Sequence, residues 1–110
     1  MQSVLLGEAV EHAPVAILVA DDEMRYVAAN ATATELLGYT REELLRLRVT
    51  DVASYPEAEG EFEAMIATGE LMGRTTVTRK DGTKLSLRHR SSETKIAGLA
   101  YYVAVLWPDP

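Results

Sequence analysis

His89 is the residue of this sequence whose type and position most clearly suggest chemistry. It lies in a β-prone run, residues 83–92, in which alternate positions fall on one face, and its neighbours on that face include Leu85 and Leu87. An imidazole on an apolar face could hydrogen-bond a small ligand, bind a metal or respond to pH. The alternative is a core histidine whose ring is satisfied by a neighbouring hydroxyl, such as that of Tyr101.

The remaining reactive residue types point away from catalysis. The chain has no cysteine, which excludes disulfides, thiolate metal sites and a cysteine nucleophile. Four glutamates, at positions 57, 59, 61 and 63, are spaced so that a helix spreads them around its surface, which is typical of a solvated face rather than a metal site. Asp21 and Asp22 fit a turn better than a catalytic pair. We therefore expect neither an enzyme nor a bound metal.

The charge and the apolar runs of the sequence argue against nucleic acid and membranes as partners. The 110-residue chain has a formal net charge of −6, with 14 acids and four bases in residues 1–70 and three acids and seven bases in residues 71–110. The acidic balance argues against nucleic-acid binding, which needs a basic surface. No apolar run approaches the ~18 residues of a membrane span, and no signal peptide is evident, so we expect one cytoplasmic domain with no membrane contact.

The first 30 residues predict a helix and a hairpin. Residues 2–13 place Leu5, Leu6, Ala9 and Val10 at helical spacing, and Pro14 ends this amphipathic segment. Its apolar side must be buried somewhere. Residues 15–20 form a continuous apolar strand, and residues 25–29 form the return strand after a polar turn.

The middle of the chain predicts short helices. Asn30 is a good N-cap for a helix over residues 31–37, and Gly38 a good C-cap. Thr40 and Glu43 have capping-box spacing and open a helix through residue 47, followed by a connector at 49–52. A further helix begins at Pro56 and ends before Gly69, with Phe62, Met65 and Ile66 on its apolar side.

The last third predicts three strands. Residues 71–79 and 83–92 flank an Asp-Gly turn, and residues 93–98 form a second turn before a long strand over 99–107. Because the helices and the later strands are segregated along the chain, the pattern favours an α+β fold with an antiparallel sheet.

Three motifs in this order resemble the PAS family of sensory domains. The stretch HAPVAILVADDEMRYVAAN looks like the opening hairpin, NATATELLGYTREELLRLRVTDV like the helical segment, and TRKDGTKLSL like the turn between the third and fourth strands. The resemblance implies a five-stranded antiparallel sheet with short helices over one face and a cavity between them. It also implies a division into an N-terminal helix (1–13), a PAS-like domain (14–107) and the start of a linker (108–110). The closing residues, Trp107 to Pro110, depart from the family's usual ending.

The resemblance also implies which side chains line the cavity. By comparison with the flavin-binding light-sensing branch, one face of the last strand, formed by residues 101, 103, 105 and 107, points inward, and residues 102, 104 and 106 point outward. The expected ligand-binding set is Phe62, Met65, Ile66, Thr75, Val77, Leu85, Leu87, His89, Tyr101 and Val103. The expected dimer face comprises Leu5, Leu6, Val10, Tyr102 and Leu106.

The function that follows from the resemblance is sensory. We expect a module that binds a small ligand in the cavity and relays the change through homodimer and terminal-segment contacts to an effector domain in the same parent chain. The parent would be a bacterial signalling protein, such as a histidine kinase or a transcription regulator. The alternative is a ligand-free dimerisation module. The missing cysteine excludes a covalent flavin adduct, and residues 55–67 lack the histidine that holds haem in haem-binding members, so haem is not expected.

Overall fold

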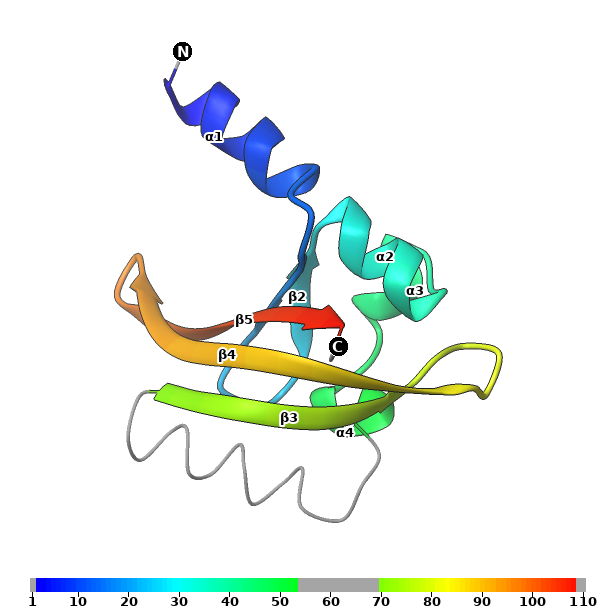
Figure 1. Cartoon of the computed structure of the whole chain (residues 1–110). Helices are drawn as coiled ribbons and strands as arrows, with labels where there is room; N and C mark the ends of the chain where they lie inside the picture. The colour runs from blue at the N-terminus through cyan, green and yellow to red at the C-terminus, as the bar shows by residue number, and fades with distance from the viewer. Residues whose placement is uncertain (1, 54–69, 109–110) are drawn as a thin grey trace.

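The chain forms a five-stranded sheet accompanied by short helices. The computed structural model describes residues 2–53 and 70–108. In chain order, its elements are α1 (Gln2–Glu11), β1 (Ala16–Ala20), β2 (Tyr26–Ala29), α2 (Ala31–Leu37), α3 (Arg41–Leu44), α4 (Val49–Val52), β3 (Glu70–Thr78), β4 (Lys84–Ile96) and β5 (Leu99–Pro108). The strands are antiparallel and follow the order β2-β1-β5-β4-β3 (Figure 1). This confirms the expected α+β class.

Local capping chemistry fixes the ends of α2 and α3. The Asn30 side chain accepts a hydrogen bond from the Ala33 N–H at the start of α2, and Gly38 ends that helix with a φ of 79°, where glycine carries no steric cost. Thr40 and Glu43 form both bonds of a capping box at α3. All three features agree with the expectation from sequence.

Two segments differ from the expectation. Residues 49–52 form the helix α4 rather than a connector, because the Asp51 carboxylate accepts a hydrogen bond from the Arg48 N–H at 2.8 Å and Val49 N–H donates to the Met24 carbonyl. The turn expected at 93–98 contains only Ala97 and Gly98, because β4 and β5 continue as a two-stranded ribbon past the ends of their neighbours. Glu93, Thr94 and Lys95 on the β4 half of that ribbon are polar and exposed.

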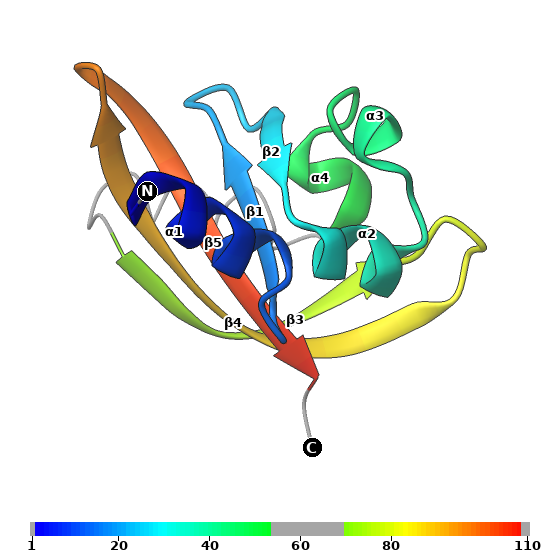
Figure 2. The ribbon, with the colours of Figure 1, turned by 90° about the horizontal axis from the view of Figure 1, so that it is seen from above.

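The core lies on one face of the sheet, which we call the inner face. Buried side chains of β1 on this face pack with buried side chains of α2, α3 and α4; the fully buried ones among them are Ala16, Ala33, Leu37, Leu44 and Val52. The opposite, outer face carries no described helix packed into the core. Figure 2 shows α2, α3 and α4 grouped beside β2, with α1 apart from this group.

The register of the sheet decides which residues of β5 reach the core. Residues directly opposite each other on neighbouring strands share a face. Ala16, on the inner face of β1, pairs with Leu106, which pairs in turn with His89 on β4. Leu106 and Tyr102 are accordingly 7% and 5% exposed. The expected outward direction of Tyr102, Ala104 and Leu106 is therefore wrong.

None of the helices in the described ranges is long and apolar enough to span a lipid bilayer.

Candidate functional site

A short polar row lies within the apolar inner face. Thr75 on β3 and His89 and Ser91 on β4 are all less than a tenth exposed, and the fully buried Leu87 lies among them. Strand geometry puts these side chains on the same face. Residues 87, 89 and 91 of β4 alternate onto one face, and Thr75 pairs directly with Leu87. We call Thr75, His89 and Ser91 the inner polar row.

His89 is the central member of this row. Its Nδ1 lies 3.4 Å from the Ser91 Oγ, a long contact whose donor depends on the ring tautomer. Directly opposite on β3 stands Gly73, which presents no side chain to the imidazole, and a Cβ added there would meet no atom within 4 Å. The arrangement offers hydrogen-bond donors and acceptors on a buried apolar surface, which is how small-molecule sites fix orientation.

The structure places part of the expected ligand-binding set together. Five members lie on the inner face, where Leu85 is half-buried and the other four are buried: Thr75, Val77, Leu85, Leu87 and His89. Phe62, Met65 and Ile66 lie outside the described residues. Tyr101 and Val103 are on the outer face, because their neighbours Tyr102 and Ala104 pair with the inner residues Ala20 and Leu18. Tyr101 therefore cannot satisfy His89.

Sequence reasoning misplaced two inner residues, since Tyr102 and Leu106, expected at a dimer face, belong to the buried inner side. Ser91, which contacts His89, follows from strand alternation but was not among the expected ligand-binding residues. Burial raises the pKa of the Tyr102 phenol, and the carboxylates of Glu93 and Asp22 add to that effect. The same cause, burial, raises the pKa of Tyr26 on β2 far more, with a smaller contribution from Asp51. Both phenols therefore stay protonated at neutral pH.

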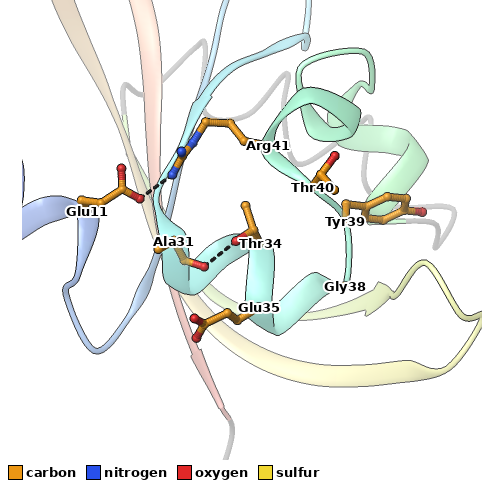
Figure 3. A pocket seen from close by; sticks show the side chains of 8 residues that line it. All are labelled: Glu11, Ala31, Thr34, Glu35, Gly38, Tyr39, Thr40 and Arg41. Atoms are coloured by element: carbon orange, nitrogen blue, oxygen red, sulfur yellow. Dashed lines mark hydrogen bonds and ion pairs between the residues drawn. The ribbon is translucent and has the colours of Figure 1, made fainter.

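A second concave region lies on the helices rather than on the sheet. It is an open hollow of about 490 Å³, lined by Glu11, Ala31, Thr34, Glu35, Gly38, Tyr39, Thr40 and Arg41. Figure 3 shows the Arg41 guanidinium directed at the Glu11 carboxylate across it, and these two groups form an ion pair. None of the lining residues belongs to the inner polar row.

The outer face carries an apolar stripe. Leu99, Tyr101, Val103, Val105 and Trp107 alternate along β5 and share this face with Arg88 and Arg90 of β4, which pair with Trp107 and Val105. The helix α1 has no buried residue, and its Val4, Leu5 and Leu6 are 67%, 62% and 64% exposed. We call the five β5 residues the outer stripe.

Comparison with known families identifies the fold. A family model described as a PAS domain matches residues 14–106. The chain belongs to the PAS domain family. This confirms the resemblance drawn from the sequence motifs.

Solved structures of PAS domains superpose over almost the whole chain. A domain of a sensory box sensor histidine kinase/response regulator from Geobacter sulfurreducens is 25% identical, with a TM-score of 0.82 over 98% of this chain and 94% of that chain. A PAS domain from a two-component sensor histidine kinase has a TM-score of 0.86 at 13% identity, covering 99% of this chain and 100% of that one. An RNA-binding Light-Oxygen-Voltage receptor has a TM-score of 0.83 at 23% identity, covering 96% of this chain but 32% of that one.

These solved relatives include sensory domains of histidine kinases and a light receptor. A search of curated protein sequences gives no significant match.

Proposed function

We propose that this PAS domain is a non-catalytic sensory module that binds a small organic ligand against the inner polar row. The observation that supports this is the burial of three hydrogen-bonding side chains, Thr75, His89 and Ser91, in one row of an otherwise apolar sheet face. Hydroxyl groups and an imidazole ring offer both donors and acceptors. The suited ligand is therefore a compact, partly apolar molecule with a carbonyl, carboxylate or hydroxyl group at the end that reaches His89.

Signalling in this proposal is a population shift. The ligand changes the packing of the helices on the inner face, and the change reaches an effector domain of the same parent chain through the terminal segments. Such a ligand acts only if it binds the two packing states with different affinity. The proposed parent is a bacterial cytoplasmic signalling protein, as the histidine-kinase origin of two solved relatives suggests. Nucleic acid is not part of the proposal, since the chain is acidic.

Native mass spectrometry tests the ligand directly. We expect the gently purified wild-type chain to carry a co-purified small-molecule mass that disappears on denaturation. His89→Leu places an apolar side chain on the inner face that cannot form hydrogen bonds. We therefore expect this variant to lose the co-purified ligand mass. Arg88→Leu, the adjacent residue on the outer face of the same strand, is the matched control and should retain it.

Two results would contradict this site. If His89→Leu retains the mass as well as the wild type does, the ligand does not contact the inner polar row. If the wild-type chain is free of any ligand and no metabolite raises its Tm, the domain is a ligand-free interaction module.

The exposure of α1 favours a second function, homodimerisation. Helices shorter than about 12–15 residues are marginal in water without packing. The ten residues of α1 include the helix-destabilising Gly7, and no residue of α1 is buried. A second copy of this chain would supply the missing contact, with α1 of one copy on the outer stripe of the other.

The outer stripe replaces Tyr102 and Leu106 as the sheet half of the proposed dimer face, together with Leu5, Leu6 and Val10 of α1. The stripe spans eight residue steps, or about 27 Å, whereas α1 is about 15 Å long, so a whole helix fits along it. The acidic Glu8 of α1 would then face the arginines beside the stripe. Exposed pairs of this kind contribute only about 0–1 kcal/mol each, so apolar burial has to dominate.

Analytical ultracentrifugation tests the dimer. We expect the wild-type chain to sediment as a dimer at micromolar concentration, and Leu6→Glu to sediment as a monomer because a charge replaces an apolar contact. Val27→Glu changes another exposed apolar residue, on β2, and should leave the dimer intact. A wild-type chain that is monomeric over the same range would rule out this second function.

A further inference from the structure

The side chain of Asn30 joins the end of one helix to the start of another. Its Oδ1 accepts hydrogen bonds from the Ile17 N–H at 2.9 Å and the Ala33 N–H at 3.0 Å. Its Nδ2 donates to the Val10 carbonyl at 2.8 Å and the Val15 carbonyl at 3.0 Å. Asn30 is only 4% exposed, and these four bonds use the full capacity of its amide.

This arrangement gives Asn30 two capping roles. The Val10 carbonyl belongs to the last turn of α1, where helical carbonyls lack partners within the helix. The Ala33 N–H belongs to the first turn of α2, where the same is true of N–H groups. One buried amide therefore bonds a carbonyl at the C-terminal end of α1, which also accepts from the Ala13 N–H at 3.3 Å, and an N–H at the N-terminal end of α2.

Two further side chains of the α2–α3 segment hold the same end of α1. Thr32 Oγ1 donates to the Ala13 carbonyl at 2.6 Å, just after α1. Arg41 at the start of α3 forms an ion pair with Glu11, the last residue of α1, while its Nε donates to the Ala29 carbonyl at 2.9 Å. We call Asn30, Thr32 and Arg41 the α1 anchor.

The anchor is what attaches α1 to the domain. No α1 residue is buried, and the helix rises away from the sheet with only its C-terminal end near α2 (Figure 1). A helix held at one end takes its direction from the groups that hold that end. In this chain those groups lie on α2 and α3 and on the residue that caps α2.

We propose that Asn30 is a positioning residue that fixes the direction in which α1 leaves the domain and makes α1 follow movements of α2. This inference rests on the proposed sensory function for its purpose, because α2 packs on the inner face that would receive the ligand. It adds a specific route: a shift of α2 moves the Asn30 amide, and the amide carries the Val10 carbonyl in the last turn of α1 with it.

Spin-label distances test the position of α1. Because the chain has no cysteine, Gln2→Cys and Glu35→Cys give one labelled pair, on exposed sites of α1 and α2. The labelled chain is diluted in unlabelled chain so that only distances within one copy are measured. We expect one narrow distance distribution in the wild-type background.

The test variant and its control are a pair of threonines on the same helix. Thr32→Val removes the bond to Ala13, whereas Thr34→Val removes a bond of equal length, 2.6 Å, to Ala31 within α2 itself. We expect Thr32→Val to widen the distance distribution about twofold, because α1 then samples more directions. Thr34→Val should match the wild type. A global loss of structure would affect both variants alike.

Asn30→Asp sharpens the test of the residue itself. Aspartate keeps the oxygen that accepts from Ala33 and Ile17, so α2 keeps its cap, but it has no N–H to donate to Val10 and Val15. We expect the same broadening as in Thr32→Val while the circular dichroism of the domain is retained. If Asn30→Asp unfolds the chain, Thr32→Val still decides the outcome.

The result that overturns the inference is a distance distribution that stays the same in Thr32→Val and in any folded Asn30→Asp variant. In that case the partner copy or the sheet, and not the anchor, fixes α1. All measurements use the chain without added ligand. Retention of the ligand mass in His89→Leu would therefore refute the proposed site without touching this inference, and the reverse also holds.

Discussion

At the residue scale, Glu43 shows how one half-buried side chain connects three segments. Its carboxylate accepts a hydrogen bond from the Thr40 N–H at 2.9 Å in the capping box of α3, and it lies 2.6 Å from the Lys80 Nζ in the β3–β4 turn. The Lys80 N–H also donates to the Leu37 carbonyl at the end of α2. The bond to Lys80, followed by the bond to Thr40, lowers the pKa of Glu43.

The lowered pKa predicts a pH dependence of stability. A carboxyl whose pKa is lower in the folded state stabilises the fold above its unfolded pKa and loses that contribution as the pH falls through the folded pKa. We expect the Tm of the wild-type chain to fall as the pH drops below 4.5, the ordinary pKa of this group, and Glu43→Gln to fall less over that range. Glu42→Gln, on the same turn of α3, should follow the wild type; equal slopes for Glu43→Gln and the wild type would contradict the prediction.

Residue roles that depend on near neighbours were accessible from sequence. The caps at Asn30, Gly38 and Thr40 follow from residue types within four positions, and all three are confirmed. The bonds from Asn30 to Val10 and Val15 were not accessible, because they join segments 20 and 15 residues apart whose approach depends on the fold. The contact of His89 with Ser91 follows from strand alternation, but a ligand role for His89 stays a prediction.

At the element scale, β5 shows where pattern reading fails. Both of its faces are apolar, with Tyr101, Val103 and Trp107 on one and Tyr102 and Leu106 on the other, so alternation cannot choose the inner face. The number of residues in the β4–β5 turn does identify the inner face of β5. A hairpin turn with an even number of residues pairs odd-numbered positions of β4 with even-numbered positions of β5, which puts His89 on the same face as Tyr102 and Leu106.

The same turn predicts a stabilising substitution. Ala97 and Gly98 both have positive φ, at 52° and 79°, and Ala97 has a side chain that disfavours this region. Asparagine tolerates the conformation, and Asn-Gly is the preferred pair for such turns. We expect Ala97→Asn to stabilise the fold by about 1 kcal/mol and to raise the Tm by about 4 °C in thermal unfolding.

Ala97→Val is the opposing control. Its branched side chain fits a positive φ poorly, so it should lower the Tm. A decrease with both substitutions would show that the turn contributes through its alanine methyl rather than through backbone strain.

At the scale of the whole molecule, the acidic and basic parts of the chain supply the two sides of the proposed dimer contact. The acidic first part of the chain supplies α1 and the β1–β2 hairpin, and the basic last part supplies Arg88 and Arg90 beside the outer stripe. In the proposed dimer these two parts meet between copies. The uneven charge is then a property of how one molecule meets the next.

The proposed dimer predicts an effect of helix propensity on association. Gly7 lies in α1 with no atom within 4 Å of an added Cβ, so Gly7→Ala changes helix propensity without a clash. If α1 becomes fully ordered only on docking, the gain of about 1 kcal/mol per helix, two helices per dimer, tightens dimerisation by up to about 30-fold. Ala9→Gly should weaken it in turn. Unchanged dimer Kd in both variants, measured by sedimentation, would contradict docking through α1.

The sheet order also bears on how the chain folds during synthesis. The last strand to leave the ribosome, β5, lies between β1 and β4, and it is the sole link between the β1–β2 and β3–β4 hairpins within the described sheet. Until β5 emerges, the two hairpins have no strand to join them, and the contacts between β1 and β5 span more than 80 residues. Such long-range pairing forms late. We therefore expect nascent chains that end before β5 to remain incomplete and dependent on chaperones, and folding to occur as one cooperative step once β5 is released.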